Sequence, residues 1–298
     1  RDDDEILDLW RGAGADVREQ RVRFPKGLLR QLISTAPAQF TQHARNPARN
    51  VEIGGNNTVF APVYVAPFVR DMEGGTRYGT IEDFCNFVKL AYQSTYIHHS
   101  GGTVCEPVDL PVNKRHLDMV YSHLKLSDKP FMGSVTAPER AQDSVDMAKL
   151  VFGSEFVDNN VVMVNLINAN SPMMFDGTML GALKVYARHH QACIVSPFIL
   201  SGAMSPVTVA GTLTQLLAEA MAAALRRREV TAGTAPGHRR SHQLRGEAVR
   251  LSDQRLAMTW RLFTPEDGET LTVAQEAEIS AQAWQRGEAG LLARLASK

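Results

Sequence analysis

Four apolar runs that recur at intervals of 30 to 35 residues constrain the fold of this chain more than any other feature. They begin near Tyr96 (YIHHSGG), Phe131 (FMGSVTAP), Val161 (VVMVNLINANSP) and Ala192 (ACIVSPFILSGAMSP). Each run ends in Gly, Ser, Asn or Pro and is followed by a segment whose apolar residues have helical spacing. A repeated order of strand, polar loop and helix is typical of a parallel α/β fold.

Helices are expected both after the runs and before them. Thr80 is expected to cap a helix that precedes the first run, with Asp83 three residues later as in a capping box. The other helices are expected over residues 113–123, 138–152, 176–189 and 205–225. The N-terminal part is predicted to hold helices over 1–45 with a short strand at 22–24, a hairpin of 51–55 with 58–62, and a loop over 68–80.

The repeat stops near residue 225, where a further strand is expected. Nine arginines fall between residues 226 and 261 with no apolar period of 2.0 or 3.6, and residues 269–297 regain a helical composition. We therefore predict three parts: an N-terminal helical and hairpin segment (1–55), an incomplete barrel of parallel β/α repeats (56–225), and an arginine-rich and helical tail (226–298).

The composition excludes several kinds of partner. Thirty-two basic and 32 acidic residues give a formal net charge of zero, so there is no electrostatic reason to expect nucleic acid or an anionic membrane surface. No apolar run reaches the roughly 18–20 residues that a membrane span needs. The three cysteines form no CxxC pair, which indicates a reducing compartment, the cytoplasm. The first residue is not Met, so residues are expected to be missing upstream, and a homo-oligomer is left open.

The candidate site lies where the runs end, because a parallel β/α barrel places its site at the carboxyl ends of the strands. Polar amide, hydroxyl and imidazole groups at these ends can orient a substrate, and glycines let a bulky ligand approach the backbone. The candidates for substrate contact are His98, His99, Asn165, Asn168, Asn170 and Phe198. The candidates for contact with a cofactor are Gly101, Gly102 and Ser201.

Each candidate also has a purely structural interpretation. Neighbouring residues on a strand point to opposite faces, so at most one of His98 and His99 faces the site, and a metal site from this pair is not expected. The asparagines alternatively satisfy loop backbone groups. Aromatic residues such as Tyr96, Phe175 and Phe198 are expected in the core, and a cation held against such rings is a quaternary ammonium. Glu106 and Asp109 are candidates for acid/base work or for shaping a loop.

Several long stretches closely resemble the trimethylamine methyltransferase family. They are FVRDMEGGTRYGTIEDFCNFVKLAY, IHHSGGTVCEPVD, PVNKRHLDMVY, SDKPFMGSVTAPERAQDSV, NLINANSP and PFILSGAMSPVTVAGTL, and they extend from about Val59 to about Ala220. The resemblance implies a TIM barrel and the transfer of a methyl group from a methylated amine to the cobalt of a separate corrinoid protein. It places the chain in methylamine metabolism and methanogenesis, with corrinoid as the cofactor of the partner and no protein-bound metal.

The sequence differs from the family pattern at two points. Some members use pyrrolysine on trimethylamine, whereas others lack it and are similar to glycine betaine methyltransferases. This sequence contains no pyrrolysine, which favours a quaternary amine whose leaving group is already a neutral amine. The resemblance also stops near residue 222, where the family continues with further barrel strands. The C-terminus is therefore interpreted as truncated or divergent, of the kind that a shifted reading frame produces.

Two other classes of function compete with this hypothesis. The first is a non-catalytic remnant or partner-binding fragment of the family that keeps the partial barrel. The second is a metal-dependent TIM-barrel hydrolase, which is disfavoured because no spaced His and Asp ligands occur at successive run ends. No catalytic residue is assigned from the sequence.

Overall fold

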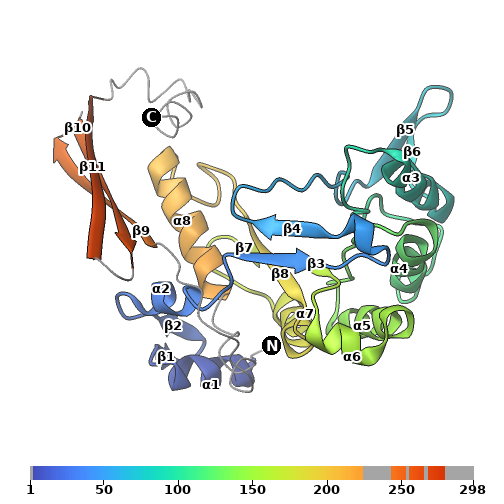
Figure 1. The fold of residues 1–298 in the computed structure, drawn as a ribbon, viewed down its shortest axis with the longest axis horizontal. Helices are drawn as coiled ribbons and strands as arrows, with labels where there is room; N and C mark the ends of the chain where they lie inside the picture. Colours follow the sequence, from blue (N-terminus) through green and yellow to red (C-terminus); the bar gives the residue numbers. More distant parts are fainter. Residues whose placement is uncertain (1–2, 224–242, 253–254, 265–267, 279–298) are drawn as a thin grey trace. The chain divides into compact units, whose positions relative to one another are not determined.

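The computed structural model describes residues 3–223, 243–252, 255–264 and 268–278 (Figure 1). The chain divides into two units, Arg1–Ala235 and Pro236–Lys298, and the first is a mixed α/β structure. None of the helices in the described ranges has the length and apolar character that a bilayer crossing requires.

The parallel arrangement is clearest in the last two runs. Strands β7 (Val164–Asn170) and β8 (Ala192–Phe198) pair in parallel from one end to the other. Helix α7 (Gly177–Arg188) connects them, so strand, loop, helix and strand follow as the spacing predicts.

The first run lies beside the second and the second beside the third, but the first two runs are not regular strands. The backbone N–H of Ser100 donates to Pro130 O at 2.8 Å, and that of Met132 donates to Gly101 O at 2.9 Å. Phe131 in turn forms a parallel bridge with Met163. The four runs are thus neighbours in chain order, but the prediction of four strands is wrong for the first two. Glycine at 101, 102 and 133 weakens a strand, and Pro130 has no N–H to give to a ladder.

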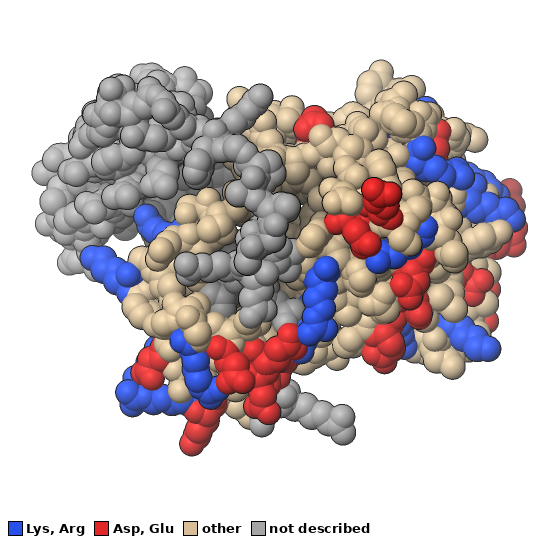
Figure 2. All heavy atoms as spheres, turned by 60° about the horizontal axis from the view of Figure 1, so that its bottom comes forward, with Lys and Arg blue, Asp and Glu red and all other residues tan. Residues whose placement is uncertain are grey.

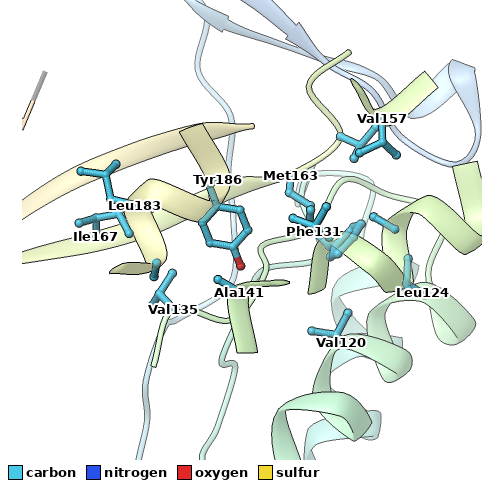
Figure 3. Packing of buried hydrophobic residues seen from close by; sticks show 14 residues of the cluster. Val120, Leu124, Phe131, Val135, Ala141, Val157, Met163, Ile167, Leu183 and Tyr186 are labelled. Atoms are coloured by element: carbon cyan, nitrogen blue, oxygen red, sulfur yellow. The ribbon is translucent and has the colours of Figure 1, made fainter. Parts of the chain in front are cut away.

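Helices pack beside one another in chain order over these runs. They are α3 (Ile81–Gln93), α4 (Arg115–Leu126), α5 (Pro138–Phe152) and α7, with the short α6 (Ser154–Asn159) after α5. Helix α5 buries Ala141, Val145 and Ala148 at helical spacing against β7 and α7, where Tyr186 lies in the same core (Figure 3). Pro138 begins the helix as predicted. The described ranges contain no closed barrel.

The N-terminal region is a small layer of its own. It comprises α1 (Asp4–Gly12), β1 (Asp16–Arg18), β2 (Arg21–Arg23) and α2 (Leu28–Ile33), which enclose Trp10 and Leu32. The strand expected at 22–24 is present as β2. The side chain of Lys184 on α7 donates to Asp3 at 2.9 Å and to Glu5 at 3.0 Å, which ties α1 to the helical layer.

The predicted hairpin of residues 51–55 with 58–62 is wrong. Strand β4 (Val51–Gly54) pairs instead with β3 (Gln39–Gln42), through a turn that contains the 3₁₀ helix η1 (Pro47–Arg49). The buried side chain of Gln42 explains the choice, because its Nε2 donates to Phe131 O at 3.0 Å and to Val162 O at 3.3 Å. These bonds tie β3 to the second and third runs, which a local turn signal cannot reveal.

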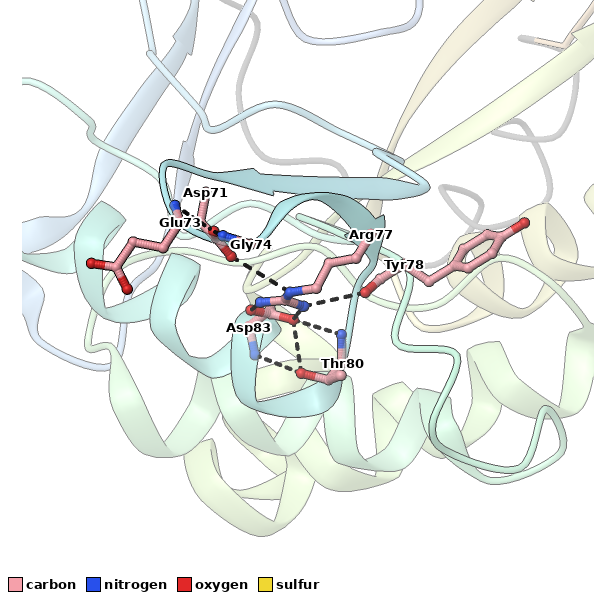
Figure 4. A network of polar contacts seen from close by, with 7 residues as sticks. All are labelled: Asp71, Glu73, Gly74, Arg77, Tyr78, Thr80 and Asp83. Carbon is pink, nitrogen blue, oxygen red and sulfur yellow. Dashed lines mark hydrogen bonds and ion pairs between the residues drawn. The ribbon is translucent and has the colours of Figure 1, made fainter.

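A second hairpin forms where a loop is predicted. Strands β5 (Phe68–Asp71) and β6 (Gly75–Tyr78) pair just before α3. The capping box of Thr80 and Asp83 is confirmed, and Figure 4 shows the Arg77 guanidinium forming hydrogen bonds to both Asp83 carboxylate oxygens, at 2.6 and 2.7 Å. The bonds from Arg77 and Thr80 hold the pKa of Asp83 well below its usual range.

Helix α8 (Val209–Ala222) ends the first unit's described part, and its Glu219 is buried. The Glu219 carboxylate accepts hydrogen bonds from Ser171 Oγ at 2.6 Å, Met173 N at 2.8 Å and Gln215 Nε2 at 2.8 Å. It therefore holds the loop that follows β7. Basic and acidic side chains are interspersed over the described part of the face in Figure 2.

The second unit contains an antiparallel sheet of three strands, β9 (Gln243–Ser252), β10 (Arg255–Thr264) and β11 (Gly268–Glu278). The helix predicted from residue 269 is wrong as far as residue 278, where the chain forms β11. The β-branched residues of TLTV near the start of this strand favour it. Residues 279–298 and the arginines at 226–228, 239 and 240 lie outside the described ranges.

Candidate functional site

A cavity of about 180 Å³ lies in the first unit, where the runs end. A single water molecule needs only ~10–15 Å³ by this measure, so a small organic molecule has room here. The lining comes from residues 64–65, 102–103 and 132–136, from one side of α4, and from Glu106, Arg140, Asn168 and Met179. Segments far apart in sequence thus meet at one place.

The segment of residues 58–66 reaches the cavity because its backbone lies alongside the first run and the residues just after it. Val65 N donates to Thr103 O at 2.6 Å, and Glu106 N donates to Ala66 O at 3.0 Å. These bonds bring the Tyr64 ring to the cavity wall. Burial raises the pKa of the Tyr64 phenol, although a hydrogen bond with Thr103 works against this shift.

The charged residues of the lining differ in how they are paired. Arg115 forms an ion pair with Glu106, and both side chains are largely shielded from solvent. Arg140 lies in the first turn of α5, and its Nη1 donates to Thr136 Oγ1 at 2.8 Å. No carboxylate pairs with Arg140 within the described part of the chain. Among the described residues, therefore, none balances the charge of the Arg140 guanidinium in the cavity lining.

Two histidines on α4 line the same cavity and have different partners. His123 accepts from Ser100 Oγ at Nδ1 and donates from Nε2 to Gly102 O, both at 2.7 Å. The carbonyl can only accept, which places the proton on Nε2. Burial lowers the pKa of His123 to about 4, so this ring is neutral near pH 7. His116 instead bonds through Nε2 to Asp143 on α5 at 2.7 Å.

The two predicted histidines of the first run lie beside the cavity lining rather than in it. His99 is buried, and its Nδ1 accepts from Gly101 N at 2.9 Å. Burial, and then the nearby His123, lower the pKa of His99 to about 3. His98 accepts from Phe60 N at 3.1 Å. His99 thus holds the backbone at Gly101 and His98 holds the backbone at Phe60, and contact with substrate stays a prediction for both.

The three asparagines of the third run have three different environments. Asn165 is buried, accepts from Gly133 N at 3.0 Å and donates to Ala192 O at 3.0 Å. Asn168 lines the cavity, and its amide has no hydrogen-bond partner within the ranges that the structure describes. Asn170 donates to Asp176 Oδ2 at 3.1 Å beyond the strand end. The period of two along β7 puts Asn165 on the face opposite to Asn168 and Asn170. Of the three, Asn168 lines the cavity, since Asn170 is bonded to Asp176 at the end of the strand.

Of the remaining predicted residues, Gly102 has the clearest relation to the cavity. A Cβ at Gly102 would lie 2.6 Å from Tyr64 Cε2, so the close approach of this ring requires glycine. Gly101 has a positive φ of 89°. Ser201 donates to Val207 O at 2.9 Å in the loop after β8. Phe198 lies at the end of β8 with 66% of its surface exposed.

The expectation that the aromatic residues of the runs are buried is wrong for two of them. Tyr96 is 83% exposed, and Phe198 is exposed as well. They lie at the beginning of the first run and at the end of β8, where no described segment covers them.

Sequence reasoning missed Tyr64, Arg115, His116 and Arg140 as cavity residues. Three of them lie in the first part of a helix directly after a run, so the first turns of the following helices were the available signal. Glu106 pairs with Arg115, whereas Asp109 accepts from Ile81 N at 2.9 Å at the start of α3. The described ranges contain no cluster of three or more His, Cys, Asp or Glu side chains suited to a metal ion.

Comparison with known proteins adds to this geometry. A family model described as trimethylamine methyltransferase matches residues 1–236, so the match also includes the N-terminal layer and ends where the first unit ends. A glycine betaine methyltransferase of Desulfitobacterium hafniense (strain Y51) is 43% identical over 229 residues, which are 76% of this chain and 48% of that protein. A proline betaine:corrinoid methyltransferase of Eubacterium limosum is 24% identical over 225 residues, 72% of this chain and 46% of that protein. The chain spans about half the length of these relatives.

Proposed function

The chain belongs to the trimethylamine methyltransferase family, and we propose that it acts on a betaine, from which it passes a methyl group to the cobalt of a corrinoid protein. The observation that carries this proposal is the 43% identity to a glycine betaine methyltransferase over 76% of the chain. The more distant relative carries both betaine and corrinoid in its name, which supports the same donor and acceptor here.

The chemistry suits the residues at the cavity. In the transfer the C–N bond breaks, its electron pair stays on nitrogen, and a bond from carbon to cobalt(I) forms, which leaves cobalt(III) and a neutral amine. A quaternary ammonium needs no proton or metal to activate this leaving group. Holding the donor in line with the acceptor can supply on the order of 7–11 kcal/mol of such a barrier.

This chain's own residues would bind and orient the donor. The Asn168 amide has no partner among the described residues and could bond to the donor. The Tyr64 ring lines the cavity, where an aromatic ring can hold an ammonium, and Gly102 leaves room for this ring. His123 is positioned to keep Gly102 in place through its bond to the carbonyl. We propose substrate contact for Asn168 first. Substrate contacts by His98, His99, Asn165, Asn170 and Phe198, and corrinoid contacts by Gly101, Gly102 and Ser201, are proposals that rest on the sequence alone.

A TIM barrel is the architecture that we propose for the family's complete fold. The parallel neighbours in chain order, with a helix after each of the runs, support this proposal. In such a barrel the cavity would lie at the carboxyl ends of the strands, where the corrinoid could face the donor.

The test is to mix the full chain with a corrinoid protein in the cob(I) state and glycine betaine. We expect the cob(I) absorbance to fall and that of methyl-cob(III) to rise. Asn168→Ala is expected to slow this change, whereas Asn159→Ala, on the exposed part of α6, serves as the control. A folded chain that gives no methyl-cob(III) would contradict the proposal and favour the alternative of a non-catalytic, partner-binding member of the family.

A further inference from the structure

The lining of the cavity carries an excess of positive charge. Its charged groups are Arg115, Arg140 and Glu106, and Glu106 is already paired with Arg115. His123 is neutral near pH 7. His116 forms a hydrogen bond through Nε2 with Asp143. The guanidinium of Arg140 is thus the group that a ligand in this cavity has to complement.

The position of Arg140 is not explained by the stability of its helix. It is the third residue of α5, where the helix dipole favours an anion rather than a cation. Thr136 is its hydrogen-bond partner among the described residues, and this bond uses one nitrogen of the guanidinium. The remaining N–H donors form a planar fork that fits a carboxylate in a bidentate manner.

We propose that Arg140 binds the carboxylate of a zwitterionic methyl donor, so that the cavity selects betaines over methylated amines that have no carboxylate. This inference rests on the proposed function and adds its selectivity. A betaine is neutral overall, and its carboxylate offsets the charge of Arg140 while its ammonium lies against Tyr64 and the Asn168 amide. Choline or a protonated tertiary amine would bring a second positive charge with no counter-ion.

The experiment compares three probes of similar size by isothermal titration calorimetry with the full chain. Glycine betaine has both charges, choline has the ammonium alone, and 3,3-dimethylbutyrate has the carboxylate with a neutral tert-butyl group. We expect glycine betaine to bind at least about 10-fold more tightly than choline. Arg140→Gln is expected to weaken the binding of glycine betaine and 3,3-dimethylbutyrate by roughly 10- to 100-fold, as for hydrogen bonds between charged groups. It should not weaken the binding of choline, because it removes a like charge.

Two further variants make the result specific. Arg140→Lys keeps the charge but not the fork, so its loss should be smaller than that of Arg140→Gln. Arg188→Gln removes an exposed charge that pairs with Glu5 and should leave all three affinities unchanged. The comparison of the three probes on the unaltered chain does not depend on any variant being folded.

Each outcome has one meaning. Equal binding of glycine betaine and choline, or an unchanged affinity of a folded Arg140→Gln variant, would overturn the role of Arg140 and leave the proposed function standing. Binding of 3,3-dimethylbutyrate that depends on Arg140, with no binding of either ammonium compound, would keep this role and contradict the proposed function. Absence of binding by all three probes would overturn both.

Discussion

Replacing Lys129 by Met is expected to destabilise the first unit strongly, although Lys129 touches no part of the cavity. Lys129 is 3% exposed, and its ammonium donates to the carbonyls of Ala91 at 2.8 Å, Ser94 at 2.7 Å and Ile97 at 2.6 Å. All three donors of the group are used. They join the end of α3 to the beginning of the first run, which leads to the cavity.

The magnitude follows from what Lys129→Met leaves behind. The Met side chain keeps an apolar stem but leaves three carbonyls without their donor, at ~1–3 kcal/mol for each that stays buried. Ala91 is buried, whereas Ser94 and Ile97 are half-buried and can bond to water instead. Burial lowers the pKa of Lys129, so the variant also recovers the cost of burying a charge. The net loss is expected to be roughly 3 kcal/mol.

Urea unfolding followed by circular dichroism measures this loss as a lower midpoint at an unchanged slope. Lys89→Met is the matched control, because Lys89 is exposed on α3 and its contact with Asn86 at 3.4 Å is weak. The control is expected to change the free energy of unfolding by no more than about 0.5 kcal/mol. A loss below about 1 kcal/mol for Lys129→Met would refute the reasoning.

Three further predictions concern the surroundings of the cavity. His99 and His123 have pKa values of about 3 and 4 in the folded chain, below the unfolded value of about 6.5. The unfolded chain therefore binds more protons between pH 6.5 and 4, so the free energy of unfolding should decrease by up to about 2.7 kcal/mol for each unit by which the pH is lowered. His123→Gln should halve this slope in denaturation curves measured across the pH range. An unchanged slope in the variant would contradict the shift assigned to His123. Glu219→Ala should lower the free energy of unfolding, measured with urea, by roughly 2–4 kcal/mol, since three donors lose their acceptor. A change below about 1 kcal/mol would contradict the role of Glu219. Gly102→Ala should lower the free energy of unfolding by about 1–3 kcal/mol, because the new methyl group displaces the Tyr64 ring. The same variant should bind glycine betaine more weakly in calorimetry, and an unaltered affinity would show that Tyr64 does not form the wall of the binding site.

Local signals in the sequence predicted the elements that depend on local chemistry. Helix α5 begins at Pro138 and ends at Phe152 as its spacing indicates, and the Thr80 capping box is formed by neighbours in the chain. The partner of β4 could not be predicted in this way. The glycines and asparagines of 54–57 indicate a turn, but the bonds from Gln42 to the second and third runs favour β3 as the partner.

The cavity shows the same division between local and long-range information. The rule that sites lie at strand ends identified Gly102 and Asn168. It also selected Asn165, which is buried and uses its amide to bond to the backbone at Gly133 and Ala192. Tyr64 reaches the cavity from a segment that lies beside the first run, and this contact has no signature in the nearby sequence. Arg140 had an available signal, because it lies in the first turn of the helix that follows the second run.

The most direct test of the account follows the methyl carbon itself. Glycine betaine labelled with ¹³C in its methyl groups is incubated with the full chain and a corrinoid protein in the cob(I) state, and the products are measured by NMR. We predict that dimethylglycine and cobalt-bound methyl form in equal amounts. Labelled glycine betaine that remains unchanged in the presence of a folded chain would contradict it.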